Sequence, residues 1–231
     1  MHGGDAAKQA YDVLAPTYDE FVHGYMYERW TARLLDEARA HGLTGKRLLD
    51  VGCGTGLSLI TMVERGWRVT GCDISAGMLE LARAKVDGRA ELVVADMREL
   101  PVLGEFDLVW AVNNPFNYLL SVEELVATLS GMRGNLAPGG IVLFDLATLV
   151  TFRGLFSEEH KVETGGRSLR WRGEAAVADL RPGAIAEAEV RAAIEAAGLR
   201  CLGAYGELES DLHQPLDEER HNMAVYVCRL T

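Results

Sequence analysis

A glycine-rich turn between an apolar run and a helix-like pattern is the feature that most constrains this chain. The turn is Asp50-Val51-Gly52-Cys53-Gly54-Thr55-Gly56, with a short apolar run at 47–49 before it and a helix-like run at 57–60 after it. Glycines at alternate positions let the backbone turn sharply and let a ligand approach main-chain atoms. The pattern predicts a strand, a ligand-accessible turn and a helix.

The side chains around this turn narrow the class of ligand. No lysine follows Gly56, so the turn does not match a P-loop, whose lysine contacts phosphates. The dinucleotide pattern G-x-G-x-x-G needs a glycine where Leu57 stands, and the carboxylate of Asp50 would repel a pyrophosphate at the helix N-terminus. A ligand with positive charge and no phosphate fits better. S-adenosylmethionine (SAM), with its sulfonium and ammonium groups, is such a ligand.

Two more carboxylates follow predicted strands at the spacing expected for an adenosine site. Residues 67–72 form a second predicted strand that ends at Asp73, which can accept hydrogen bonds from both ribose hydroxyls. Residues 90–95 form a third strand that ends at Asp96 and Met97. There a carboxylate can accept from the adenine amino group, and the methionine can lie against the ring.

Strands and helices alternate along the first two thirds of the chain. A fourth strand is expected at 106–112, and a turn at 136–140 precedes a fifth strand at 141–146. This alternation predicts a parallel sheet with right-handed crossovers, in which ligands bind at the carboxyl ends of the strands. Residues 199–206 and 223–230 are expected to complete the sheet as an antiparallel pair, joined by a long acidic loop.

The motifs taken together resemble those of the class I SAM-dependent methyltransferases. D-V-G-C-G-T-G, G-C-D-I-S, A-D-M, F-D-L-V and L-A-P-G-G occur in that family's order and spacing between residues 8 and 146. One glycine motif is a weak signal, but five in register are specific. The resemblance implies SAM as the cofactor, with contacts from Tyr18, Asp50, Gly52, Gly54, Gly56, Asp73, Ile74, Met78, Asp96, Met97 and Asn113.

The fold that the resemblance implies is one α/β domain across the 231 residues. It is a Rossmann-like, seven-stranded, mostly parallel sheet whose last strand is antiparallel, with helices on both faces. Its expected parts are an N-terminal helical cap, the SAM-binding core, a short β lid insertion, and a C-terminal helix and strand pair; they span residues 8–42, 46–146, 147–185 and 187–231. A hairpin around Gly165-Gly166 is expected within the lid.

Two tyrosine–aspartate pairs lie in the expected N-terminal cap. Tyr11-Asp12 and Tyr18-Asp19 are seven residues apart, so on a helix both rings would lie near one face. In the family that the chain resembles, such a segment often lies over the cofactor, which would bring Tyr18 to SAM or to the acceptor. Pro16 is expected to divide the segment into two short helices.

The loop after the fourth strand is expected to hold the methyl acceptor. Residues 113–118 lie beside the methyl group in this family, and Asn117 and Tyr118 are the candidate catalytic residues there. His213, on the acidic loop, is the candidate general base. The loop is also similar to the N-P-P-F/Y motif of amide and base methyltransferases, with Asn114 in place of the first proline.

Composition excludes some partners. The net charge of −11, from 34 acidic residues against 23 Lys and Arg, opposes binding to nucleic acid or to an anionic membrane surface. The four cysteines, Cys53, Cys72, Cys201 and Cys228, form no C-x-x-C pair. They predict no metal site and are expected to be reduced thiols of a cytoplasmic protein.

The sequence therefore predicts a SAM-dependent methyltransferase, a monomer or homodimer, acting on a nitrogen or oxygen atom of a small metabolite. An amino sugar, an amino acid derivative or a natural product is the expected acceptor, since no added recognition domain for a polymer is apparent. Two alternatives stay open. One is methylation of a protein amide or a nucleic-acid base, and the other is a SAM-binding protein without catalysis.

Overall fold

A computed structural model gives the fold of most of the chain. It describes residues 8–9, 11–12, 14–15, 18–19, 27–148, 150–151, 159–164, 167–172, 185–209 and 211–231, with only the backbone for 159–164 and 167–172. The described residues between 8 and 19 are helical. Pro16, expected to divide that segment, lies outside the described residues, as does most of the expected lid.

The described elements follow the alternation expected from the sequence. In chain order they are α2 (Tyr27–Ala40), β1 (Arg47–Val51), α3 (Leu57–Glu64), β2 (Arg68–Asp73), α4 (Ala76–Val86), β3 (Ala90–Val94), η1 (Met97–Glu99), β4 (Phe106–Ala111), η2 (Pro115–Tyr118), α5 (Val122–Gly134), β5 (Leu136–Ala147), β6 (Glu159–Thr164), β7 (Arg167–Arg172), α8 (Glu187–Ala196), β8 (Leu199–Leu208), β9 (Asp211–His213) and β10 (Met223–Leu230). None of the helices within these ranges is long and apolar enough to cross a membrane.

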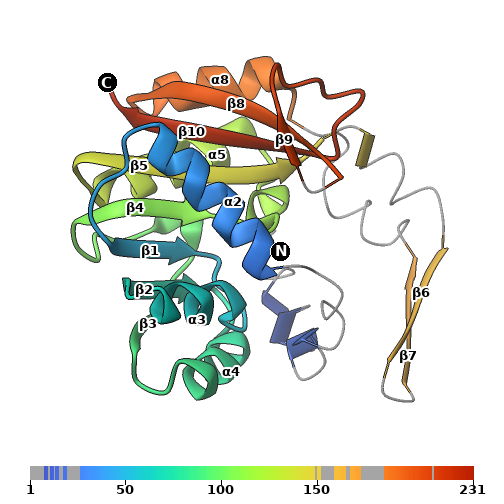
Figure 1. Ribbon diagram of the computed structural model, residues 1–231. Coiled ribbons are helices and arrows are strands. Elements are labelled where there is room, and N and C mark those ends of the chain that lie inside the picture. The colour runs from blue at the N-terminus through green and yellow to red at the C-terminus, as the bar shows by residue number, and fades with distance from the viewer. Residues whose placement is uncertain are drawn as a thin grey trace.

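The central sheet has the strand order β3-β2-β1-β4-β5-β10-β8-β9 (Figure 1). The pairs from β3 to β5 are parallel, whereas β10 lies antiparallel between β5 and β8. The Rossmann-like fold with an antiparallel last strand is therefore confirmed. Because the chain moves outward from β1 in both directions, the strand order reverses between β1 and β4, which is where open parallel sheets bind ligands.

Three short strands, β6, β7 and β9, lie outside the alternation of strands and helices in the core. β9 adds an eighth strand, in which Leu212 is buried and pairs with Glu207 of β8, so part of the connection expected as a loop joins the sheet. Three residues are too few to give a periodic signal in sequence. β6 and β7 form a separate antiparallel pair in which Thr164 faces Arg167, and the predicted hairpin is confirmed.

The expected turn at 136–140 is part of β5. Its register against β4 jumps from Phe106 opposite Leu136 to Leu108 opposite Ile141, so the residues between are extruded as a bulge. Pro138 lacks the N–H that a regular ladder needs, and Gly139 has φ +78°. The sequence located the break correctly, but the strand continues across it.

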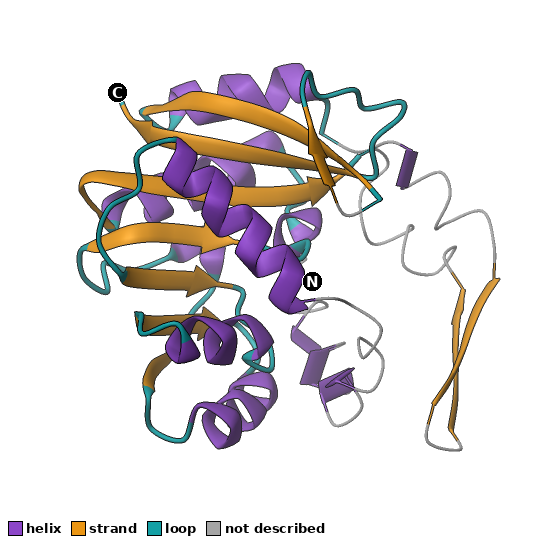
Figure 2. Ribbon diagram, in the orientation of Figure 1, coloured by secondary structure: helices purple, strands orange, loops and turns teal. Residues whose placement is uncertain are grey.

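Helices cover both faces of the sheet, and each face carries its own apolar cluster (Figure 2). α2, α3 and α4 pack on one face, and α5 and α8 pack on the other. In β4, Leu108 and Trp110 join the first cluster while Val109 and Ala111 join the second, as the two-residue period of a strand requires. A strand segment covered on both sides is apolar on both faces, which explains the run from Leu108 to Ala111.

One buried polar side chain fixes the start of β5 to the loop before β4. Asn135 is fully buried, and its Oδ1 accepts from the backbone N–H of Leu103 at 2.6 Å. Its Nδ2 donates to the carbonyls of Pro101 and Gly131 at 2.9 and 3.0 Å. A single buried amide thereby bonds three backbone groups from two segments.

We expect Asn135→Ala to lower the free energy of unfolding by roughly 2–4 kcal/mol, because it removes three hydrogen bonds of a fully buried side chain. Urea unfolding followed by circular dichroism measures this change. Ser130→Ala is the matched control on the same helix: its hydroxyl is exposed and bonds only the carbonyl of Val126, so the change should stay within about 0.5 kcal/mol. Equal effects of the two substitutions would contradict the assignment.

Candidate functional site

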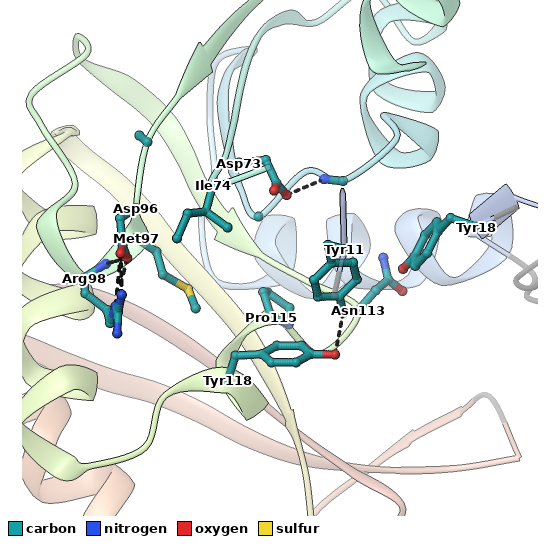
Figure 3. A pocket seen from close by; sticks show the side chains of 13 residues that line it. Tyr11, Tyr18, Asp73, Ile74, Asp96, Met97, Arg98, Asn113, Pro115 and Tyr118 are labelled. Atoms are coloured by element: carbon teal, nitrogen blue, oxygen red, sulfur yellow. Dashed lines mark hydrogen bonds and ion pairs between the residues drawn. The ribbon is translucent and has the colours of Figure 1, made fainter. Parts of the chain in front are cut away.

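A cavity lies at the carboxyl ends of β1, β2, β3 and β4, beside the point where the strand order reverses (Figure 3). Its walls come from the turns after these strands and from helical residues near the N-terminus. The described residues that line it are Tyr11, Tyr18, Gly52, Gly54, Asp73, Ile74, Ala95, Asp96, Met97, Arg98, Asn113, Pro115 and Tyr118.

The three glycines of the turn after β1 have different physical roles. All have positive φ, of 77°, 54° and 82° for Gly52, Gly54 and Gly56. A Cβ at Gly52 would lie 2.8 Å from the Cβ of Pro115, and one at Gly56 would lie 3.0 Å from the Cβ of Ala82. A Cβ at Gly54 would meet no atom within 4 Å. Gly52 and Gly56 thus permit close packing, whereas Gly54 leaves the cavity wall open to a ligand.

Asp73 ends β2 and faces the cavity. One of its carboxylate oxygens accepts from the backbone N–H of Gly54, and the other accepts from that of Ser75, both at 2.9 Å. Burial raises the pKa of Asp73 above its ordinary value, and these hydrogen bonds oppose the rise. The backbone N–H of Ile74 also bonds this carboxylate. A carboxylate can accept about four hydrogen bonds, so capacity remains for a ligand donor.

Two further carboxylates are buried behind the cavity. Asp50 is 1% exposed and accepts from the hydroxyl of Ser58 at 2.5 Å. Asp145 is fully buried and accepts from the backbone N–H groups of Asn113 and Asn114 at 2.8 and 2.6 Å. Burial raises the pKa of each of these two aspartates to about 6. The interior next to the cavity therefore favours positive charge.

Asn113 and Asn114 hold an uncommon backbone conformation at the end of β4. Their φ angles are +68° and +71°, a region that non-glycine residues seldom occupy, and the carboxylate of Asp145 fixes both N–H groups. The side-chain Oδ1 atoms of both are buried without a hydrogen-bond partner. Asn113 lines the cavity, so the end of β4 contributes to its wall.

The cation at the β3 side of the cavity is already paired. The guanidinium of Arg98 bonds both carboxylate oxygens of Asp96, with Nη2 at 2.6 Å from Oδ2, and its Nη1 donates to Glu124 at 3.1 Å. Burial raises the pKa of Asp96, but the hydrogen bonds and charge of Arg98 outweigh it and hold that pKa below its ordinary value. Arg98 thus fixes Asp96 and brings no unpaired positive charge to the cavity.

Three phenol rings form another part of the wall (Figure 3). The hydroxyl of Tyr11 donates to that of Tyr118 at 2.5 Å. The ring of Tyr11 meets the rings of Tyr118 and Tyr18 edge-on, at centroid distances of 5.3 and 6.1 Å. Burial raises the pKa of both Tyr11 and Tyr118, so these phenols stay neutral.

Two aspartates tie the N-terminal helical residues to both ligand-facing turns. Asp12 accepts from the hydroxyl of Ser75, after β2, at 2.5 Å. Asp19 accepts from the hydroxyl of Thr55, after β1, at 2.5 Å and pairs with Lys85 at 2.6 Å. The rings of Tyr11 and Tyr18 are held over the cavity by contacts that are distant in sequence.

Most residues predicted to contact a cofactor lie around this one cavity. They are Tyr18, Gly52, Gly54, Asp73, Ile74, Asp96, Met97 and Asn113. Three others do not line it. Asp50 lies behind the turn, Gly56 packs against α4, and Met78 is buried within α4 with its N–H bonded to the capping hydroxyl of Ser75.

The predicted catalytic residues are dispersed. Tyr118 lines the cavity. The side-chain oxygen of Asn117 accepts from the backbone N–H of Ala147 at 2.9 Å, which anchors η2 to β5. His213 is exposed on β9, where its ring stacks against that of His221 at a centroid distance of 5.8 Å. Neither Asn117 nor His213 is among the described lining residues.

Several site residues were not predicted from the sequence. Ala95 and Arg98 line the cavity, and Asp145 accepts a hydrogen bond from the backbone N–H of Asn113. Pro115 also lines the cavity, within the loop 113–118 that was expected there. A carboxylate inside the otherwise apolar run of β5 was the available signal for Asp145, since buried acids need a partner. No local signal marks Arg98, because its second partner, Glu124, lies on α5.

Comparisons with known proteins agree with this geometry. Residues 48–140 match a family described as a methyltransferase domain. A putative methyltransferase of Geobacillus sp. is 32% identical over 152 residues, which cover 64% of this chain and 62% of that protein. A malonyl-[acyl-carrier protein] O-methyltransferase of Geobacter sulfurreducens is 30% identical over 215 residues, which cover 89% of this chain and 74% of that protein.

Amino sugar enzymes are also similar. A dTDP-3-amino-3,6-dideoxy-alpha-D-glucopyranose N,N-dimethyltransferase of Streptomyces fradiae is 33% identical over 135 residues, which cover 57% of this chain and 52% of that protein. The chain thus spans less than two thirds of the Geobacillus and S. fradiae proteins. The solved structure of a SAM-bound amino pentose methyltransferase from Micromonospora echinaspora aligns with a TM-score of 0.67 and 25% identity, over 95% of this chain and 97% of that one.

We expect Asp50→Asn to stabilise the ligand-free protein at pH 8 by roughly 1–3 kcal/mol. The folded-state pKa of about 6 lies above the ordinary value of 3.8. The contribution of Asp50 to stability is therefore full below the ordinary pKa and is lost as pH rises through about 6. Asparagine keeps an acceptor for Ser58 and does not ionise. Urea unfolding between pH 5 and pH 8 should show the variant's advantage growing with pH.

Asp107→Asn is a control for which we expect the opposite effect on stability at pH 8. Asp107 pairs with Arg47 at 2.8 Å, and the hydrogen bonds from Arg47 lower the pKa of Asp107. Its contribution is present above its ordinary pKa and is lost as pH falls, so this variant should be less stable than the wild type at pH 8. An Asp50→Asn protein that is also less stable at pH 8 would show that the buried charge is well compensated.

Proposed function

Because this chain belongs to the class I SAM-dependent methyltransferase family, we propose that it transfers the methyl group of SAM to a nitrogen or oxygen atom of a small metabolite, with an amine favoured. One observation carries the preference for an amine. The cavity is walled by phenol rings and carboxylates, and its described cation, Arg98, is already bound to Asp96 and Glu124.

The described residues fit the cofactor of this family. The chain near Asn113, at the end of β4, can face the ammonium group, and the remaining acceptor capacity of Asp73 can take a ribose hydroxyl. Asp96, held in place by Arg98, can accept from the adenine amino group. The open space at Gly54 allows the ligand to approach the backbone. Asp50 and Asp145 supply negative charge behind the site without contacting the ligand.

The protein's part in catalysis is mainly alignment. SAM supplies a methyl group on a positively charged sulfur, which leaves as a neutral thioether. What the chain must add is an acceptor held in line with the methyl group and protected from water. The pair of neutral phenols, Tyr11 and Tyr118, can orient the acceptor through their hydroxyls, while the rings of Tyr11 and Tyr18 cover the cavity.

The walls of the cavity favour an uncharged amine at the moment of transfer. A carboxylate acceptor would find no unpaired cation among the described lining residues, because Arg98 is bound to Asp96 and Glu124. An amine approaches such a wall as a cation, can lie against the tyrosine rings, and needs only to lose a proton. A hydroxyl acceptor needs a stronger base, and the described lining contains no histidine. The N,N-dimethyltransferase of S. fradiae named above acts on such an amino group.

The backbone of the loop after β4 counts against amide or base methylation. The N-P-P-F/Y motif places proline where this chain has Asn114, and proline is confined to φ near −65°. Asn114 has φ +71°, so a proline could not adopt the conformation of this loop. The loop is therefore built differently from the motif it resembles in sequence.

We also propose that two of the expected parts of the chain, the N-terminal cap and the lid insertion, lie against the site. The residues described between 8 and 19 act as a cap over the cofactor, and residues 147–185 act as a lid toward the acceptor. The contacts of Asp12 and Asp19 with the two turns support the first assignment. The second rests on the sequence pattern and on the β6–β7 hairpin.

Incubation with methyl-labelled SAM tests the function. The acceptors are matched pairs of small metabolites, such as an amino sugar and the same sugar with a hydroxyl in place of the amine. A fractionated cell extract is assayed in parallel, with label counted separately in small molecules, protein and nucleic acid. We expect label in the amine and in the small-molecule fraction. Label only in macromolecules would overturn the proposal, and SAM binding without transfer to any acceptor would indicate a non-catalytic protein.

We expect Gly54→Ala to weaken SAM binding tenfold or more, which is at least about 1.4 kcal/mol, because the new Cβ would project into the cavity. Isothermal titration calorimetry measures the affinity. Gly88→Ala is the matched control, since Gly88 also has positive φ, +73°, and open space around its Cβ, but lies in the turn before β3. Both variants should lose about 1–2 kcal/mol of stability from the unfavourable backbone conformation.

The control decides what a loss of binding means. If Gly88→Ala binds SAM as tightly as the wild type while Gly54→Ala does not, the loss is local to the cavity. Equal losses in both variants would show that destabilisation, and not the position of the Cβ, controls binding.

A further inference from the structure

Two of the four cysteines face each other across the C-terminal strands. Cys201 of β8 and Cys228 of β10 are register partners in the antiparallel pair, and the Cys201 thiol donates to the backbone carbonyl of Gly203 at 3.4 Å. Directly opposed residues in such a pair have Cα atoms about 4.5–5.5 Å apart, within the range that a disulfide spans. A register shift between Val227 and Cys228 adds local twist at this point.

The two thiols differ in exposure and acidity. Cys201 is partly exposed, whereas Cys228 is fully buried. The hydrogen bond from Cys228 and the nearby charge of Arg191 lower the pKa of Cys201, against the effect of burial. The hydrogen bond and burial both raise the pKa of Cys228. One thiol is therefore accessible and acidic, and the other is held beside it.

We infer that Cys201 and Cys228 form a redox-active dithiol that low-molecular-weight disulfides oxidise to a cross-strand disulfide. Neither residue is among the described lining residues of the cavity, so this is a modification site separate from the proposed methyl-transfer site. The inference does not depend on the proposed function.

The reaction proceeds in two exchanges. The thiolate of Cys201 attacks one sulfur of the small disulfide, a mixed disulfide forms, and the other half leaves as a thiolate. The sulfur of Cys228, as it loses its proton, then attacks the Cys201 sulfur and releases the second half. The protein dithiol is oxidised, the small disulfide is reduced to two thiols, and the protons of the two cysteines end on those thiols.

The other two cysteines provide an internal comparison. Cys53 and Cys72 are 6% and 1% exposed. Burial raises the pKa of both thiols, and the neighbouring carboxylates of Asp50 and Asp73 raise it further. Their thiolates are disfavoured, so exchange at these positions should be slow.

Oxidised glutathione is the probe for the test. The reduced, folded protein is incubated with it, quenched with N-ethylmaleimide and digested with trypsin without reduction. All four cysteines fall on different tryptic peptides, and those of Cys201 and Cys228 span residues 201–220 and 221–229. We expect these two peptides joined by a disulfide, and we expect oxidation about tenfold or more faster than at Cys53 or Cys72.

Single substitutions separate the two exchanges. Cys228→Ser should accumulate glutathione on Cys201, because the second exchange is blocked. Cys201→Ser should leave Cys228 unmodified, because its thiol is buried. Circular dichroism confirms that each variant is folded, and urea-unfolded protein confirms that the reagent reaches all four thiols.

Three results would overturn the inference. The first is a folded wild-type protein whose thiols do not react. The second is a link between any other pair of cysteines. The third is modification of Cys53 or Cys72 at the rate of Cys201.

Discussion

Carboxylates gathered at one edge of the sheet are the constraint on which the rest of the site depends. Asp50 and Asp145 lie near the ends of β1 and β5 and are buried, and Asp73 ends β2 and is half-buried. Their described partners are a hydroxyl and backbone N–H groups, and no described cation pairs with them. Burial raises the pKa of each, so the ligand-free protein holds unfavourable negative charge there. This arrangement favours a positively charged ligand.

The same carboxylates shape the backbone that would meet the ligand. Asp145 holds Asn113 and Asn114 at positive φ, and Asp73 joins the turn after β1 to the start of α4. Unfavourable backbone conformations persist only where the surroundings fix them. The carboxylates that supply the negative charge thus also hold the turns in place. Substituting one of them by a residue without an acceptor would remove its charge and also leave backbone N–H groups of a turn without their partner. For this reason Gly54→Ala and Gly88→Ala distinguish an effect on ligand affinity from an effect on stability better than substitutions of these aspartates do.

Much of the fold and the cofactor side of the site follow from local sequence. The alternating elements place Gly54, Asp73 and Asp96 at strand ends, and parallel strands bring those ends together. What could not be predicted depends on register or on distant partners. β9 is too short to be periodic, and the facing of Cys201 and Cys228 follows from the pairing of β8 with β10. Widely spaced cysteines in sequence gave no sign of it.

The described residues between 8 and 19 contact two of the turns to which the proposed function assigns the ligand. Asp12 bonds the turn after β2, and Asp19 bonds the turn after β1, so both hold turns that a ligand would also touch. The same segment carries Tyr11 and Tyr18, two of the three rings at the cavity wall. Because the cap and the ligand share these turns, fixing the turns favours both, and the two equilibria are coupled in both directions. Under the proposed function, the segment that would complete the acceptor wall is held in place by the turns that would bind the cofactor.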